Sequence, residues 1–577
     1  MIIRVWAPTA HDVQLDLRDE RLPMVRADGG WWIIDTPRAL PGVDYAFVLD
    51  GAEPPLPDPR SSSQPYGVHG RSRIVDHSAS AWTDANWSAP ALDSAIIYEM
   101  HVGTFTAAGT FEAAIDRLSH LKNLGVTHVE LMPVAEFSGD RGWGYDGVDI
   151  FAPHHAYGGP DGLKRLVDAC HASGLAVLLD VVYNHFGPSG NYLSRFGHYL
   201  THRYATPWGD AINFNERGSD EVRRLFCDNA LMWLRDYHFD GLRIDAVHAI
   251  VDLSAIHFLE QLASEVALLE KERGRRLVLI AESDLNDPKL VRATELGGYG
   301  LNAQWSDDFH HALHTALTAE RAGYYADFGS IADLAKAFRQ AWVYDGRYSN
   351  YRGRRHGRSP AGLSGHRFLG YAQTHDQIGN RAKGDRSSHL MSTGRLKIAA
   401  ALILTSSFVP MLFQGEEWGA STPFLYFTGH EEAELALAVS EGRKREFAAF
   451  GWAPDEIPDP QAIETFERSK LNWDELAREP HGEILVWHRD LIRLRARYPE
   501  LCDGRMDLVG VSFDETAPWL KLTRGRVTVA CNLSAAEQSL TIESGASCRI
   551  AMASDPRIAV RESRVDLPPD SVAILVL

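Results

Sequence analysis

The sequence lacks several features that would assign it to other classes of protein. Its five cysteines are an odd set with no CxxC spacing, which argues against a disulfide framework or a zinc site and predicts free thiols. The longest apolar run, residues 398–413, is interrupted by polar residues and a proline, so it is too short for a membrane span. The N-terminus has no basic-then-apolar secretion signal. We therefore expect a soluble, cytoplasmic protein.

Positive charge is also scarce. The 58 Lys and Arg against 77 Asp and Glu give a formal net charge of −19, which disfavours nucleic acid or an anionic membrane as the main partner. The basic run 352–358 is the local exception, and we interpret it as a solvated loop. No Gly-rich phosphate loop is present. The length of 577 residues predicts two to four domains.

Four apolar, strand-like segments end on acidic residues. They cover residues 176–185, 239–248, 277–284 and 368–376, and they close on Asp180, Asp245, Glu282 and Asp376. Two of them also carry a histidine, His185 or His375. A strand cannot bury such charges without pairing them or using them. One such strand would suit a buried ion pair, but four of them are typical of the carboxyl ends of barrel strands, where functional groups gather.

The order of elements predicts a barrel between two β-rich regions. From Ile96 onward, eight strand-like segments alternate with helical ones, the first of them over 110–125. This order favours a (β/α)8 TIM barrel and hence an α/β fold. Short alternating segments separated by turn residues flank it on both sides. We expect an N-terminal immunoglobulin-like β-sandwich over 1–88, the barrel over 89–498 with a lid-like excursion at about 186–216, and a C-terminal β-sandwich domain over 499–577.

Converging carboxylates suggest acid/base chemistry on a polyhydroxylated substrate. Glycoside hydrolysis needs a nucleophile or base and a proton donor on either side of one bond, about 5–5.5 Å apart in the retaining version. Arg243 would keep Asp245 ionised, as a nucleophile requires. The apolar residues before Glu282 would raise its pKa by desolvation, as a proton donor requires.

The four segments resemble, in order and content, the signature regions of the α-amylase superfamily, glycoside hydrolase family thirteen. The resemblance spans about residues 96–419. It implies Asp245 as nucleophile, Glu282 as acid/base and Asp376 as the stabiliser of the oxocarbenium-like state. It also implies that Arg243 orients the nucleophile, that His185 and His375 hold sugar hydroxyls, and that Tyr145 lies under the sugar. No cofactor and no catalytic metal are expected. Thr374 departs from the family pattern, which has Asn there, and we expect tuning of the site.

Segments 98–105, 206–214, 303–311 and 375–380 resemble the trehalose-releasing members of this family. That narrower resemblance implies hydrolysis of the α-1,4 bond next to the terminal trehalose of maltooligosyltrehalose, with a maltooligosyltrehalose synthase as the partner enzyme in the pathway. It places further residues in the substrate groove: Trp208, His248, Asp307, His311, Gln377 and Asn380. A glycogen branching enzyme, a general α-amylase and a non-enzymatic glucan-binding protein remain as alternatives.

Overall fold

A computed structural model describes residues 1–18, 20–448, 452–542 and 548–577. Its centre is a closed barrel of parallel strands in the order β12-β15-β16-β17-β20-β21-β8-β9. All but one of the residues in these strands are buried, as expected for strands covered on both faces. The prediction of a (β/α)8 barrel is confirmed. The strands are β8 (Ile97–Met100), β9 (His128–Leu131), β12 (Ala176–Val181), β15 (Gly241–Ile244), β16 (Val278–Ala281), β17 (Ala303–Trp305), β20 (Phe368–Gly370) and β21 (Val409–Phe413).

Helices surround the barrel. The predicted single helix over 110–125 is two helices, α2 (Phe111–Ile115) and α3 (Leu118–Leu124), and Gly125 ends the second with a φ of 103°. The apolar run 398–413 contains most of α12 and all of β21, so it is a helix leading into a barrel strand. The other long helices are α4 (Gly159–Ser173), α6 (Ser219–Asp236), α7 (Phe258–Arg273), α8 (Asp307–Thr318), α9 (Ile331–Gln340), α12 (Thr393–Leu404), α13 (Ala433–Ala448) and α15 (His481–Arg497).

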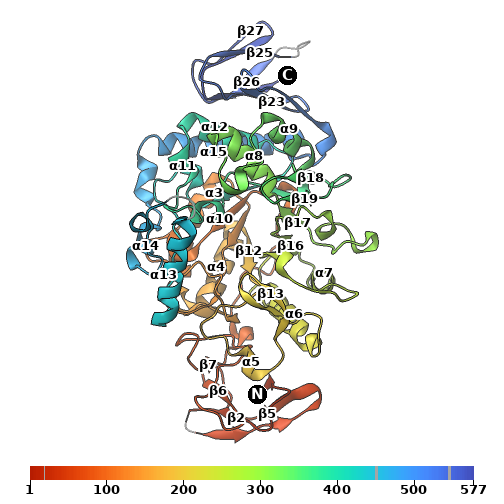
Figure 1. The fold of residues 1–577 in the computed structure, drawn as a ribbon, viewed down its shortest axis with the longest axis vertical. Helices are drawn as coiled ribbons and strands as arrows, with labels where there is room; N and C mark the ends of the chain where they lie inside the picture. Colours follow the sequence, from red (N-terminus) through yellow and green to blue (C-terminus); the bar gives the residue numbers. More distant parts are fainter. Residues whose placement is uncertain (19, 449–451, 543–547) are drawn as a thin grey trace.

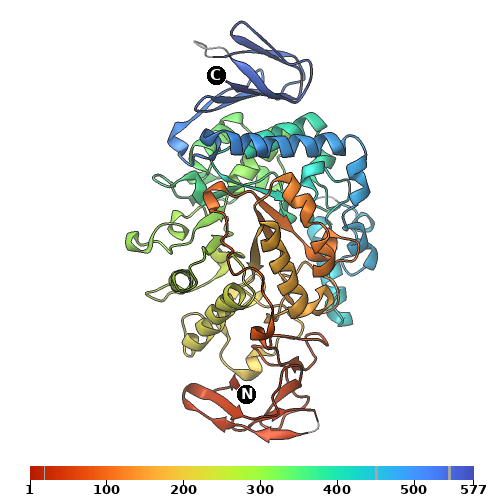
Figure 2. The ribbon, with the colours of Figure 1, turned by 180° about the vertical axis from the view of Figure 1, so that it is seen from behind.

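The two β regions lie at opposite ends of the molecule (Figures 1 and 2). The N-terminal region has a sheet β1-β5-β4 and a sheet β3-β2-β6-β7. Its strands are β1 (Ile2–Trp6), β2 (Val13–Asp16), β3 (Arg21–Pro23), β4 (Val25–Arg26), β5 (Trp31–Asp35), β6 (Asp44–Leu49) and β7 (Ser72–Arg73).

The C-terminal region has a sheet β22-β23-β24-β29-β26 and a sheet β25-β28-β27. Along β23, buried residues alternate with partly exposed ones, because successive side chains point to opposite faces of the sheet. The strands are β22 (Val509–Asp514), β23 (Trp519–Arg524), β24 (Val527–Asn532), β25 (Gln538–Thr541), β26 (Arg549–Ala553), β27 (Ala559–Arg561), β28 (Arg564–Leu567) and β29 (Ser571–Val576).

Two hairpins and one short sheet decorate the barrel. After β12, the chain forms α5 (Leu193–Phe196) and a hairpin of β13 (Leu200–Thr206) and β14 (Gly209–Ile212). Between α9 and β20, the strands β18 (Asp345–Ser349) and β19 (Arg354–Gly357) form a hairpin that contains most of the basic run. After β9, β10 (Ala135–Glu136) pairs with β11 (Asp149–Pro153). In the parts of the chain that the structure describes, no helix is long and apolar enough to cross a membrane.

Candidate active site

Arg243, on β15, is the centre of a buried ionic network. Its Nη1 donates to both oxygens of Asp180, at 2.8 and 2.7 Å, and to Oδ1 of Asp245 at 2.7 Å. Its guanidinium carbon lies 4.3 Å from the centre of the Trp305 ring. The Arg243 side chain is 1% exposed, so these two carboxylates and the ring replace the water that a cation would otherwise need.

The ends of β15 and β16 bring Asp245 and Glu282 together. Asn184 donates from Nδ2 to Oδ2 of Asp245 at 2.8 Å. Ala246 then takes a positive φ of 37°, and its N–H donates to Oε2 of Glu282 at 2.7 Å. The same oxygen lies 3.8 Å from Nη2 of Arg243. Both carboxylates therefore contact the same guanidinium, that of Arg243.

The surroundings of the Glu282 carboxyl favour its protonated form. Burial raises its pKa well above the ordinary value, and the nearby charges of Asp245, Asp307 and Asp376 raise it further against the opposing effect of Arg243. Because Oε2 accepts the amide hydrogen of Ala246, the proton belongs on Oε1.

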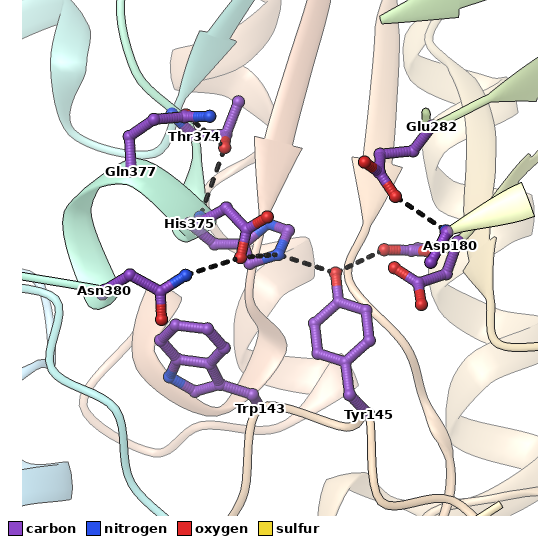
Figure 3. Close-up of polar contacts among 12 residues, drawn as sticks. Trp143, Tyr145, Asp180, Glu282, Thr374, His375, Gln377 and Asn380 are labelled. Carbon is purple, nitrogen blue, oxygen red and sulfur yellow. Dashed lines mark hydrogen bonds and ion pairs between the residues drawn. The ribbon is translucent and has the colours of Figure 1, made fainter. Parts of the chain in front are cut away.

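His375 is part of a hydrogen-bonded chain that crosses the barrel mouth (Figure 3). Tyr145 donates its single hydroxyl hydrogen to Asp180 at 2.6 Å, so His375 must donate from Nε2 to the Tyr145 oxygen, 2.9 Å away. Nδ1 of His375 faces the carboxylate of Glu99 and must also carry a hydrogen. These two contacts favour the imidazolium form of His375. Burial alone would lower its pKa, but the charge of Glu99 holds it above the usual value.

Asp376 lies in the first turn of the short helix α10 (His375–Gly379). The hydroxyl of Thr374 accepts the backbone N–H of Asp376 at 3.2 Å, and the side chain of Gln377 accepts from the backbone of Thr374 at 2.9 Å. Asn380 donates to Oδ1 of Asp376 at 3.1 Å (Figure 3). Thr374 therefore caps this helix, and its hydroxyl provides the contact that orients the Asp376 backbone.

His185 and Trp208 form a wall of the site. Their rings stack with centroids 4.5 Å apart and planes 8° apart, and His185 contacts the backbone oxygen of Tyr145 at 3.0 Å. Trp208, which belongs to the turn between β13 and β14, is 49% exposed, so it does not act as a core anchor for the excursion. An exposed indole beside a polar ring suits contact with the flat face of a sugar.

A hollow of about 590 Å³ opens beside Asp376. It brings together five predicted residues and four that sequence reasoning missed; the full lining is Asp284, Asp307, His311, Tyr324, Tyr351, Arg352, Asp376, Gln377 and Asn380. Asp307 accepts a short hydrogen bond from the Tyr371 hydroxyl, and burial raises its pKa to about 6.

Arg352 corrects the interpretation of the basic run. It lines this hollow and forms an ion pair with Asp284 at 2.9 Å, so this residue of the run is not simply solvated. The sequence of the basic run does not indicate this ion pair, because Asp284 lies far away in the chain, after strand β16. His248 lies exposed on the turn after β15, and none of the described contacts joins it to the cluster.

One group of described residues could hold a metal ion. Glu136, His154 and His155 have ligand atoms within 4.8 Å of one another, and Nδ1 of His155 contacts Oε1 of Glu136 at 2.6 Å. No predicted site residue belongs to it. The α8 histidines His310 and His314 are not part of this group; His310 contacts the Tyr325 hydroxyl, and His314 contacts Glu320.

A closed parallel barrel whose strand ends bring three carboxylates, an arginine and two histidines together defines a glycoside hydrolase of the α-amylase type. A family model described as the catalytic domain of alpha amylase matches residues 78–208. A crystal structure from Salmonella typhimurium, assigned to the alpha amylases, superposes with a TM-score of 0.91 at 38% identity and covers 100% of this chain and 97% of that one.

The relatives found by sequence indicate a narrower family than the fold does. The malto-oligosyltrehalose trehalohydrolase of Mycobacterium tuberculosis is 51% identical over 92% of this chain and 92% of its own length. The chain belongs to the malto-oligosyltrehalose trehalohydrolase family. By contrast, the 1,4-alpha-glucan branching enzyme GlgB of Pseudoalteromonas atlantica is 31% identical and covers 51% of this chain and 46% of its own length.

Proposed function

We propose that this protein hydrolyses, with retention, the α-1,4 bond next to the terminal trehalose of maltooligosyltrehalose and releases trehalose and a maltooligosaccharide. The observation that carries the proposal is the contact that Asp245 and Glu282 share with the guanidinium of Arg243, in a chain of this family. Two carboxyl groups held on one guanidinium are compatible with the short spacing that a double displacement needs.

In the first step, a carboxylate oxygen of Asp245 attacks the anomeric carbon of the sugar that lies on Tyr145. The bond to the glycosidic oxygen breaks, and Glu282 gives that oxygen its proton, so trehalose leaves as a neutral molecule. The raised pKa of Glu282 favours retention of this proton until the bond breaks. Asp376, with His375 beside it, stabilises the positive charge that develops on the ring.

In the second step, Glu282 has lost its proton and acts as the base. It takes a proton from a water molecule, the water oxygen bonds to the anomeric carbon, and Asp245 leaves as a carboxylate. Arg243 and Asn184 stabilise the charge that returns to Asp245, at hydrogen-bond distances of 2.7 and 2.8 Å. The product sugar keeps the α configuration.

The hollow beside Asp376 is our proposed site for the trehalose leaving group. It offers carboxylate, imidazole and guanidinium groups together with the rings of Tyr324 and Tyr351, a mixture suited to a compact disaccharide. Asp307, His311, Gln377 and Asn380 would hold its hydroxyls, with Trp208 and His248 further along the groove. This polar surface favours the trehalose-releasing activity over a general α-amylase.

The Asp245→Asn and Glu282→Gln variants test the assignment of the two carboxylates. Each should lose nearly all activity and remain folded, because the replacements are close to isosteric and remove only the nucleophile or the proton donor. Proton NMR of the wild-type reaction in its first minutes should show the α-anomer at the new reducing end. Early β-anomer would mean inversion, and Asp245 would then be a base.

The wider setting is also a proposal. A cytoplasmic location is supported by five unpaired cysteines, and a maltooligosyltrehalose synthase would supply the substrate. The charge of −19 supports the proposal that the protein has no nucleic-acid or membrane partner. We also propose domain limits at residues 88/89 and 498/499, supported by the end of α15 at Arg497.

A further inference from the structure

A second hollow lies between the N-terminal region and the barrel. It measures about 890 Å³ and is lined by three segments far apart in sequence, residues 66–69, 139–141 with His155, and 429–431. We propose that this hollow binds the glucan part of the substrate at a distance from the cleaved bond, so that the N-terminal region contributes to chain-length preference. The inference rests on the proposed function.

The three segments are fixed to one another. His69 contacts the Tyr192 hydroxyl at 2.7 Å and Glu432 at 3.1 Å, which joins the N-terminal region to the barrel. A Cβ at Gly190 would lie 2.4 Å from the side chain of Val68, and one at Gly139 would lie 1.9 Å from the backbone oxygen of Gly429. Such close backbone approaches hold the walls of the hollow in place without a ligand.

The hollow leads toward the catalytic residues. His430 lines it, and Nε2 of His430 lies 3.9 Å from Asp146, the residue after Tyr145. The trehalose hollow lies on the other side, since it is built by residues that follow β16, β17 and β20, whereas segment 139–141 follows β9 and β10. In the ring of strands, β9 and β17 are opposite each other. A chain bound across Tyr145 with trehalose on one side would extend toward the second hollow on the other.

The chemistry of the lining suits a neutral sugar. The side chain of His430 is 4% exposed, and among the described residues its Nδ1 has no hydrogen-bond partner. A buried polar atom of this kind is an unused contact for a hydroxyl group. Asp140 and Arg141 form an ion pair at 2.7 Å and Glu431 lies beside them, so the mixed charges disfavour a phosphate ligand.

Tyr66 provides an aromatic surface at the rim. It is 56% exposed, and its hydroxyl is held by Arg73 at 3.0 Å and donates to Asp44 at 3.2 Å. An exposed but anchored ring can contact the apolar face of a glucose unit with little loss of side-chain freedom.

The Tyr66→Ala and Glu431→Ala variants test the proposal in the full-length enzyme. We measure kcat/KM on maltooligosyltrehaloses of increasing length, from maltosyltrehalose upward. Both variants should match wild type within about twofold on the shortest substrate and fall about tenfold below it on long ones, which corresponds to about 1.4 kcal/mol of lost binding. Tyr66→Phe keeps the ring but loses the hydroxyl that anchors it, so its loss on long substrates should be smaller than that of Tyr66→Ala. Leu40→Ala, which changes an exposed residue in the same region, should behave as wild type.

An equal loss on substrates of every length would mean that Tyr66 only supports the fold, and no loss on any would mean that no sugar binds there; both overturn the proposal. Calorimetric binding of maltoheptaose separates this result from the proposed function. Weaker maltoheptaose binding to Tyr66→Ala in an enzyme that releases no trehalose would keep the glucan site and refute the trehalose-releasing activity. Unchanged maltoheptaose binding to Tyr66→Ala in an enzyme that does release trehalose would refute the glucan site and keep the trehalose-releasing activity.

Discussion

Replacing Arg243 with lysine removes the guanidinium that contacts the carboxylates of Asp245 and Glu282. Arg243 donates one hydrogen bond to Asp245 and two to Asp180, all at 2.7–2.8 Å. Lysine keeps the charge, but its side chain ends one atom short of the Nη1 position, so its ammonium cannot keep the hydrogen bonds to both carboxylates. Losing one charge-assisted hydrogen bond removes about 1.5–3 kcal/mol. At about 1.36 kcal/mol per tenfold, kcat/KM should fall about 10- to 150-fold.

Arg223→Lys is the matched control for this variant. Arg223 is also buried and binds the carboxylate of Asp252, the hydroxyl of Ser254 and the amide oxygen of Gln261, but it lies on α6 outside the site. Both variants should lower the melting temperature, because each disturbs a buried ion pair. Only Arg243→Lys should lower kcat/KM on maltooligosyltrehalose. A normal kcat/KM in Arg243→Lys, or an equal fall in both variants, would refute the role given to Arg243.

Two further variants change the pH dependence of kcat/KM. Glu99→Gln removes the anion that raises the pKa of His375, so burial then lowers that pKa. The imidazolium form exists below the pKa, so the variant loses it at a lower pH than wild type does. Its activity should therefore decline earlier as the pH rises. Asp307→Asn removes a charge that raises the pKa of Glu282, so the alkaline limb should move to lower pH, whereas the acid limb stays in place. Unchanged alkaline limbs in the two profiles would contradict these assignments. Since the pKa of Asp307 is about 6, its effect requires measurements above that pH.

The barrel was predictable because its strands are buried on both faces and read as apolar runs. Segments such as 176–185 and 277–284 end on acidic residues, and parallel strands bring those ends to one mouth. The helix over 110–125 was predicted as one piece, since its apolar spacing continues through Asp116 and Arg117, where the structure divides it.

Other parts of the site depend on contacts between distant segments. Glu99 reads as one residue of an apolar strand, and only the closed barrel brings it to His375, 276 residues later. The basic run gave no sign that Arg352 reaches Asp284. The contact of His69 with Glu432 spans 363 residues and has no local pattern at all. Pairings of this kind follow from the fold and are not visible in sequence spacing.

A comparison of maltotriosyltrehalose with maltopentaose, a maltooligosaccharide of equal length, at matched concentrations tests the proposed trehalose-releasing activity. If the hollow beside Asp376 is built for trehalose, a plain maltooligosaccharide leaves polar groups such as Asp307 and His311 unpaired, at about 1–3 kcal/mol each. Two unpaired groups correspond to roughly a hundredfold in kcat/KM. We expect that preference, with free trehalose as a product. Equal kcat/KM values on the two substrates, or cleavage of maltotriosyltrehalose without free trehalose, would contradict it.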